Sequence, residues 1–387
     1  YGNYAGTKFS TWNVNDGNPY GNMMSNRFNR SQGATLDANA YMQIEPLKGL
    51  KFKTVFGISY NSSEYRSYTP KYEYTAQSAH NISDVSQSNG HGKALTWTNT
   101  LGYDFTLKGG HAINTLFGTE WSRYDGNYTS GSNNAIVAGF DDWEHAYLSN
   151  TEGTQSITLK GAPYDDTRGM SFFWRAGWTW KERYMINATL RADKSSKFAE
   201  GHRTGWFPSV SGGWTISEEK FMAKTKTWMD FLKLRISWGQ VGNANVPCYR
   251  FLAPVTTENT HYNFGKDGGQ TGWSTGAYPN RLANPELKWE TSEQFNVGID
   301  ARFINSRLAL TTDFYIKTTK DWLINAPTLI TSGVSEKLIN GGDVKNTGVE
   351  ISLTWNDNIG KDFHYNIGGN LAYNHNKVTN IPTPDGI

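Results

Sequence analysis

The strongest constraint on the fold is a two-residue alternation of apolar and polar side chains along most of the 387 residues. One face of each alternating segment carries no Asp, Glu, Lys or Arg, apart from Glu293 at the start of one segment, although charged residues make up 19% of the chain. Successive side chains of a β-strand point to opposite faces, so the pattern predicts strands with one uncharged face. We therefore predict an all-β fold of about twelve strands, at 33–45, 51–60, 94–106, 112–122, 171–181, 184–193, 205–216, 231–240, 293–303, 307–317, 347–355 and 363–374.

The segment 293–303 illustrates the two faces. Phe295, Val297 and Ile299 alternate with residues of the opposite face, which include Asp300 and Arg302. A soluble sandwich buries its apolar face against a second sheet. A membrane barrel places that face in lipid, where a charge at mid-depth costs about 2–4 kcal/mol. The near-complete exclusion of charge therefore favours a membrane barrel.

The connections between the expected strands support the same interpretation, because short and long ones alternate. The long connections are expected at about 61–93, 123–170, 194–204, 241–292 and 318–346. Short turns at one end and long loops at the other are typical of bacterial outer-membrane barrels. The pattern predicts a transmembrane antiparallel up-and-down β-barrel with its long loops outside the cell.

Composition excludes several other classes. A net charge of +2 supplies no field that would gather nucleic acid. The single cysteine, Cys248, rules out a disulfide framework, and no apolar run is long enough for a transmembrane helix. The chain begins without a recognisable signal peptide and ends in a loop-like stretch. Because an open sheet edge in lipid is not viable, we expect residues 1–387 to be an internal segment of a larger barrel.

Three blocks carry a family resemblance. The first, within 183–246, contains RYMINATLRADKSSKFAEGHRTGWFPSVSGGWTISEEKFM and LKLRISWGQVGNANV. The second, at 284–323, reads NPELKWETSEQFNVGIDARFINSRLALTTDFYIKTTKDWL, and the third, at 339–353, reads INGGDVKNTGVEISL. In order and spacing these blocks resemble the barrel of SusC/RagA-type TonB-dependent transporters from the outer membrane of Bacteroidota.

The resemblance implies a barrel of about 22 strands with a plug domain in its lumen, of which this chain holds only barrel strands. It further implies a TonB complex that acts through an N-terminal region, and a SusD-like surface lipoprotein that closes over the loops. The imported nutrient would be an oligosaccharide, or in some members a peptide. Two transporter–lipoprotein pairs would form a dimer.

Candidate site residues fall into two groups. On the polar strand faces, charged side chains are expected to line a wet lumen, where they solvate the wall, dock the plug or contact the solute. These are Arg175, Arg191, Arg235, Asp300, Arg302 and Glu350. On the long loops, side chains are expected either to pack together or to contact the lipoprotein or a sugar. These are Asp141, Asp142, Trp143, Tyr147, Tyr164, Trp273 and Tyr278.

No motif indicates an enzyme or a cofactor. The histidines lack metal-ligand spacing, and no nucleophile elbow or P-loop is present. The acidic run at 141–144 offers oxygen ligands for calcium but lacks EF-hand spacing, which favours a solvated loop. Two other hypotheses stay open: a TonB-dependent siderophore or vitamin receptor without a lipoprotein, and a soluble secreted β-rich glycan-binding or glycan-cleaving protein.

Overall fold

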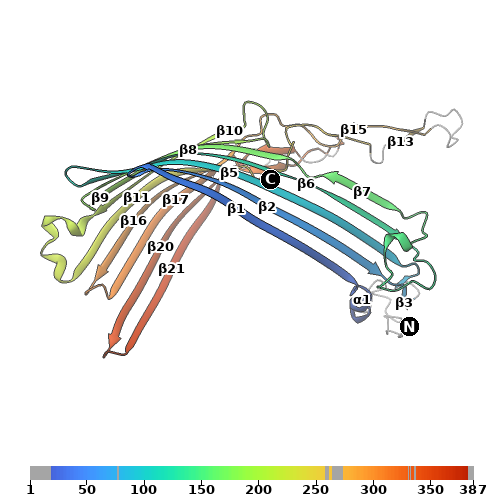
Figure 1. Ribbon diagram of the computed structural model, residues 1–387, viewed down its shortest axis with the longest axis horizontal. Coiled ribbons are helices and arrows are strands. Elements are labelled where there is room, and N and C mark those ends of the chain that lie inside the picture. Colours follow the sequence, from blue (N-terminus) through green and yellow to red (C-terminus); the bar gives the residue numbers. More distant parts are fainter. Residues whose placement is uncertain are drawn as a thin grey trace. The chain divides into compact units, whose positions relative to one another are not determined.

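A computed structural model describes residues 19–75, 78–257, 261–263, 273–329, 331, 333–334 and 337–381 (Figure 1). All twelve predicted strands are present. Their bounds are β1 Asn29–Leu47, β2 Leu50–Thr69, β5 Asp84–Leu107, β6 His111–Asn134, β8 Thr167–Trp180, β9 Tyr184–Ser195, β10 Thr204–Thr215, β11 Met229–Asn243, β16 Glu290–Phe303, β17 Leu308–Lys320, β20 Asp343–Ile359 and β21 Phe363–Asn380.

These twelve strands form one sheet in the order in which they occur along the chain. The order runs β1-β2-β5-β6-β8-β9-β10-β11-β16-β17-β20-β21, and the short β7 (Thr158–Pro163) pairs with β6. Every neighbouring pair from β8 to β21 is antiparallel. The predicted up-and-down antiparallel arrangement is thus confirmed.

Small elements occupy the connections. Among the described residues, no helix is long and apolar enough to cross a membrane. The short helices are α1 Pro19–Ser25 and the 3₁₀ turns η1 Leu148–Asn150, η2 Ile216–Glu218, η3 Lys220–Met222 and η4 Thr225–Thr227. The short strand pairs are β3 Tyr72–Thr75 with β4 Ser78–His80, β12 Val255–Thr256 with β15 Tyr278–Pro279, β13 His261–Asn263 with β14 Trp273–Thr275, and β18 Leu323–Ala326 with β19 Lys337–Asn340.

The two predicted loops at 61–93 and 123–170 are shorter in the structure than the sequence predicts. Most of 61–93 and part of 123–170 belong to strands, because β2 continues to Thr69, β5 begins at Asp84 and β6 continues to Asn134. The added segments are polar on both faces, for example Asn61-Ser62-Ser63. Backbone pairing continues there although the apolar alternation that identifies a strand has stopped. The 24 residues of β5 or of β6 extend over about 80 Å along the strand, much more than is needed to cross an apolar band about 25 Å tall.

The strand register confirms the assignment of the two faces. Residues directly opposite each other in an antiparallel pair share a face. Ile299 stands opposite Leu234 and Thr312, whereas Asp300 stands opposite Lys233 and Thr311. Apolar and uncharged residues therefore continue across the middle of one face of β8–β21, with charged residues such as Glu293 and Asp357 only near strand ends, and charged and polar residues continue across the other face.

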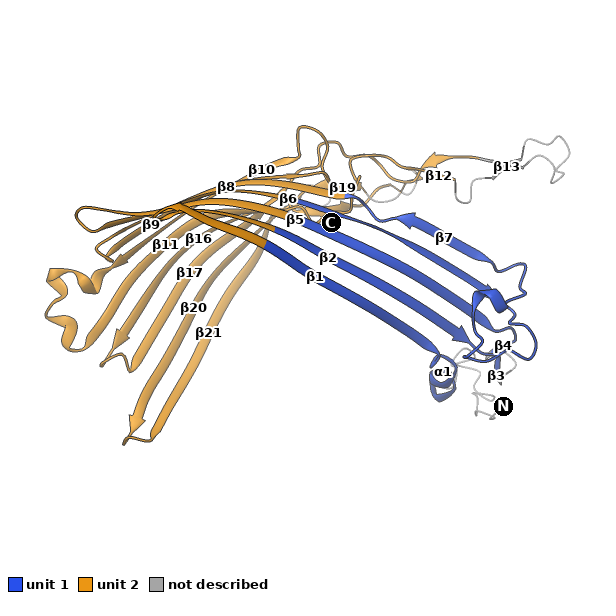
Figure 2. Cartoon of the chain, in the orientation of Figure 1, with its two compact units in different colours: residues 1–40, 56–96, 122–166 blue, residues 41–55, 97–121, 167–387 orange. Residues whose placement is uncertain are grey.

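The chain divides into two compact units (Figure 2). One holds residues 1–40, 56–96 and 122–166, and the other holds 41–55, 97–121 and 167–387. Each has a small apolar cluster formed by residues of its connections and strand ends, since strands of a single-layered wall are half-exposed. The clusters comprise Tyr68, Val85, Ile136 and Ala146 in the first unit, and Phe198, Val246 and Leu287 in the second.

Candidate functional site

Arg235 is the centre of a charge network on the polar face. It lies on β11, and its guanidinium donates to Asp300 of β16 (Nε to Oδ2, 2.8 Å) and to Asp313 of β17 (Nη2 to Oδ2, 3.0 Å). Each carboxylate receives two hydrogen bonds from the planar guanidinium. Such bidentate geometry ties three neighbouring strands together and leaves the group with a net charge of −1.

Arg191 makes a second network of the same kind. This β9 residue donates to Asp193 (Nε to Oδ1, 2.8 Å) and to the Ser171 hydroxyl (Nη2 to Oγ, 3.0 Å). Its guanidinium also lies 3.6 Å from Glu120 and over the ring of Phe173. Arg191 and Arg235 are therefore engaged by the wall itself.

Arg175 is in a different environment. In the described part of the chain, no carboxylate lies within ion-pair distance of this exposed β8 residue. It borders a groove of about 500 Å³ on the polar face. The groove is lined mainly by hydroxyl and amide side chains, among them Asn187, Thr189, Ser209, Ser211, Ser237 and Gln294. The wall thus offers an uncharged hydrogen-bonding surface with one available cation at its border.

The two remaining strand residues of the predicted set lie outside this groove. Arg302 stacks on the ring of Phe231, with its guanidinium carbon 5.2 Å from the ring centroid. Glu350 is exposed and stands opposite Asp313 in the β17–β20 register.

In the first unit, an arginine organises the loop residues. The guanidinium carbon of Arg66 lies 3.9 Å from the ring centroid of Trp143 and 4.2 Å from that of Tyr147. Trp143 also stacks on Phe28, with centroids 6.0 Å apart. Trp143 is therefore half-buried, whereas Tyr147 keeps 43% of its surface exposed. Loop packing accounts for Trp143, and Tyr147 remains accessible.

The two aspartates of this loop have partners nearby. Asp141 accepts a hydrogen bond from the Tyr68 hydroxyl (3.2 Å) and forms an ion pair with Lys71 (3.2 Å). Asp142 accepts from the backbone N–H and Nδ1 of His145, both at 2.9 Å. The backbone hydrogen bond is the main reason why the pKa of Asp142 lies below its ordinary value.

The other predicted loop aromatics are separate from the Arg66 cluster. Tyr164 stacks on Tyr128, with centroids 5.7 Å apart. Tyr278 in β15 is 38% exposed. Trp273 begins β14, but its side chain lies outside the described residues. The structure therefore joins Asp141, Trp143 and Tyr147 around strand β2, and it places Tyr164 and Tyr278 elsewhere.

Sequence reasoning did not select Arg66 or Asp313 as site residues. Asp313 carries a detectable signal, because it alternates onto the same face as Asp300 in adjacent strands. Arg66 carries none, since it lies beyond the apolar part of β2 and meets aromatics of an irregular loop. In the described part, no group of three or more His, Cys, Asp or Glu side chains is placed to hold a metal ion.

The second and third sequence blocks meet in the connections of the second unit. The Asn340 amide nitrogen donates to the Lys288 carbonyl (2.8 Å), and its amide oxygen accepts from the Lys288 N–H (2.8 Å). Asn284 donates to the carbonyl of Leu338 (2.8 Å). These contacts fix two long connections to each other, so a structural role accounts for these parts of the blocks.

Comparison with known proteins identifies the fold family. The chain is 30% identical over 355 residues to TonB-dependent receptor P39 of Formosa agariphila, covering 89% of this chain and 32% of that receptor. It is 33% identical over 253 residues to TonB-dependent receptor SusC of Bacteroides thetaiotaomicron, covering 64% of this chain and 24% of SusC. The chain thus spans about a third or less of the length of these relatives.

A solved structure of the RagAB peptide importer in its closed-closed state matches with a TM-score of 0.80 and 27% identity. The match covers 92% of this chain and 38% of that one. The family model for TonB dependent receptor-like β-barrels matches residues 1–387. The chain therefore belongs to the TonB dependent receptor-like β-barrel family of the bacterial outer membrane, as its sequence blocks and its two-faced sheet indicate.

Proposed function

We propose that the protein imports an oligosaccharide or peptide nutrient across the outer membrane, with energy from a TonB complex and with a SusD-like surface lipoprotein as its partner. The observation that carries this proposal is the polar face of β8–β21, where Arg191 and Arg235 are paired within the wall and hydroxyl and amide side chains line the groove beside Arg175. The likeness to SusC and to the RagAB peptide importer adds support for nutrient import rather than catalysis.

The groove beside Arg175 suits such a solute chemically. Its hydroxyl and amide side chains can exchange hydrogen bonds with sugar hydroxyls or peptide amides as the solute moves. Because Arg191 and Arg235 are already paired, they do not form strong sites that would trap a passing carboxylate. A surface of many weak hydrogen bonds supports passage better than one of a few strong ion pairs.

The exposed loop aromatics support a partner on the outer side. Tyr147 and Tyr278 present apolar rings with a hydroxyl, the residue type that protein interfaces favour. Tyr147 is also held in place by Arg66, which reduces the entropy lost when a partner binds.

Mild-detergent purification of the native protein from membranes tests this proposal. We expect a stoichiometric lipoprotein to co-purify, together with bound glycan or peptide that mass spectrometry can identify. A barrel that purifies without a lipoprotein and binds ferric siderophores would contradict the proposal. So would recovery of the protein from the soluble fraction.

A pair of variants tests the groove in the intact transporter. We expect Arg175→Gln to change the uptake rate of the identified nutrient several-fold. Arg302→Gln is the matched control, because Arg302 is an exposed arginine on the same face outside the groove. Equal uptake by both variants and the natural protein would exclude a role of the groove in transport.

A further inference from the structure

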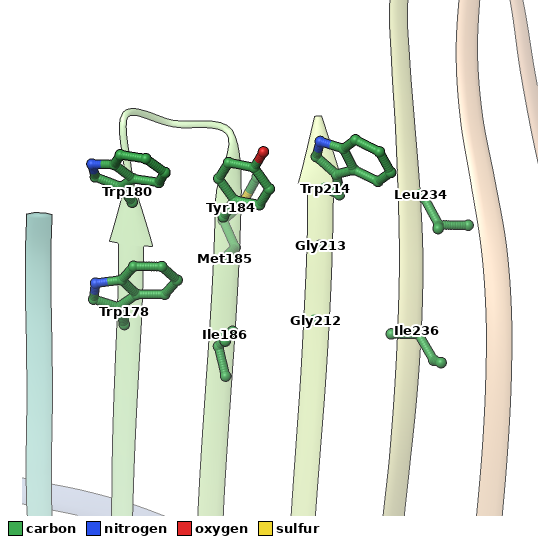
Figure 3. Close-up of a pocket in the computed structure, with 10 residues that line it drawn as sticks. All are labelled: Trp178, Trp180, Tyr184, Met185, Ile186, Gly212, Gly213, Trp214, Leu234 and Ile236. Atoms are coloured by element: carbon green, nitrogen blue, oxygen red, sulfur yellow. The ribbon is translucent and has the colours of Figure 1, made fainter. Parts of the chain in front are cut away.

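A concave site lies on the apolar face of the wall near the short-turn end of β8–β11 (Figure 3). Its volume is about 380 Å³. Two rows of residues line it across four strands. The first row is Trp178, Ile186, Gly212 and Ile236, and the second is Trp180, Tyr184, Trp214 and Leu234.

Gly212 creates the hollow. It stands between Ile186 and Ile236 in the register, and Figure 3 shows bare backbone between their side chains. A Cβ added at Gly212 would meet Ile236 Cγ2 at 3.4 Å and the Met185 carbonyl oxygen at 3.9 Å, which are ordinary contacts. The backbone at this position thus accepts a larger side chain, and the hollow exists because the sequence has a glycine there.

Aromatic rings close the end of the groove nearest the turns. Tyr184 stacks between Trp180 and Trp214, with centroid distances of 5.6 and 6.3 Å. Their polar atoms are bound to the turn region: Tyr184 Oη donates to Glu219 (2.6 Å), and Trp180 Nε1 donates to the Gly109 carbonyl (3.0 Å). Rings with one wet and one apolar side mark the boundary between water and hydrocarbon.

A free cation stands beyond this boundary. Lys181 follows Trp180 directly, and its Nζ lies 5.0 Å from the ring centroid of that tryptophan. Among the described residues, no carboxylate lies within 4 Å of the exposed Lys181 ammonium. Arg183 in the same turn is engaged by Glu219 at 3.5 Å. The hydrogen bond from Tyr184 is the main cause that lowers the pKa of Glu219, so this carboxylate stays ionised and holds Arg183.

We propose that this groove binds one acyl chain of an anionic glycerophospholipid, whose phosphate is recognised by Lys181. The barrel spans a membrane, so lipid covers its uncharged face. Short turns face the periplasm in such barrels, which places the groove in the periplasmic leaflet. A volume of about 380 Å³ accommodates a single chain, and the order of apolar groove, aromatic boundary and cation follows that of acyl chain, glycerol backbone and phosphate.

The proposal is tested with the full-length transporter, purified in detergent and delipidated. Native mass spectrometry would measure binding of palmitoyl-oleoyl phosphatidylglycerol and of the corresponding uncharged diacylglycerol. We expect one retained phosphatidylglycerol per chain. Gly212→Leu fills the groove and should weaken this binding at least tenfold. Gly369→Leu is the matched control, because Gly369 lies on the apolar face of β21 with no atom within 4 Å of an added Cβ.

Lys181→Gln tests the contribution of the lipid headgroup separately from that of the acyl chain. We expect it to weaken phosphatidylglycerol binding about fivefold, the usual effect of one cation at a membrane surface. Binding of diacylglycerol should be unchanged. Folding of each variant is checked by heat-modifiable gel mobility, and Ile236→Trp fills the groove from the neighbouring strand if Gly212→Leu does not assemble.

Equal lipid retention by the natural protein and both groove-filling variants would overturn the proposal. Equal loss in Gly212→Leu and Gly369→Leu would also overturn it, because the lipid would then bind the apolar face without a specific site. If the protein instead formed a dimer without bound lipid, and Gly212→Leu or Ile236→Trp dissociated that dimer, the groove would be an interface with a second copy of the chain. The proposal would then be wrong.

Discussion

Arg235 in the middle of the wall and Arg66 near the end of strand β2 are both fixed by several partners, but the partners differ in kind. Arg235 is held by two carboxylates from neighbouring strands, at positions that the register dictates. Arg66 is held between two aromatic rings of an irregular connection. Carboxylates hold Arg235, whereas the π-faces of two aromatic rings hold Arg66.

The difference reflects what surrounds each arginine. On the polar face of the wall, strands stand about 5 Å apart, so two carboxylates can reach one guanidinium without leaving the sheet. The loop cluster has no such lattice and stabilises itself with an apolar core around Tyr68 and Ile136. The rings of Trp143 and Tyr147 on the Arg66 guanidinium extend that core.

The largest expected effect comes from placing a charge on the wrong face of the wall. Ile299→Arg puts a cation on the lipid side of β16, where Ile299 is 41% exposed. We expect a loss of about 2–4 kcal/mol in the free energy of unfolding, or failure of assembly. Asn296→Arg, on the polar face of the same strand, should be tolerated. Urea unfolding in lipid vesicles measures both, and equal tolerance would remove the distinction between the faces.

A second variant tests whether the carboxylates require their arginine. Arg235→Gln leaves Asp300 and Asp313 close together without a cation between them. We expect the free energy of unfolding to fall by about 1–3 kcal/mol, because hydrogen bonds to charged groups are removed and two like charges remain close together. Adding Asp313→Asn to Arg235→Gln should restore part of this stability. If the double variant is no more stable than the single one, repulsion between the carboxylates is not the cause.

The same contrast explains how far the sequence could predict this molecule. Alternation identified every wall strand and its lipid face, because lipid forbids charge and so leaves a readable pattern. The strand ends were missed at Thr69 and Asp84, because the regular apolar alternation stops before them and the apolar residues there, Tyr68 and Val85, pack into the loop cluster. The Arg66 cluster could not be found, since no periodic rule brings β2 against residues 143–147. The groove at Gly212 depends on a register across four strands that sequence does not supply.

A smaller effect is expected from opening the loop cluster. Arg66→Gln removes two cation–π contacts, each worth about 0.5–1 kcal/mol or more. We expect faster hydrogen exchange in the segment 140–150 and unchanged exchange in β16 and β17. Arg66→Lys, which keeps the charge but not the planar stacking surface, should give an intermediate rate. Equal exchange in all three proteins would mean that the core around Tyr68 holds the loop alone.

The smallest expected effect concerns the Asp142–His145 contact. The folded pKa of Asp142 lies below the ordinary value of 3.8, so its carboxylate stabilises the loop above that value. The contribution is lost as the pH falls through the lowered pKa. With fluorotryptophan incorporated, the ¹⁹F resonance of Trp143, assigned with Trp143→Phe, should stay constant from pH 7 to 5 and shift only below about pH 4. Asp142→Asn should abolish this shift, because asparagine accepts the backbone hydrogen bond without titrating. A midpoint above 4, or one that persists in Asp142→Asn, would assign the transition to another group, and the loop would then depend on Arg66 rather than on this aspartate.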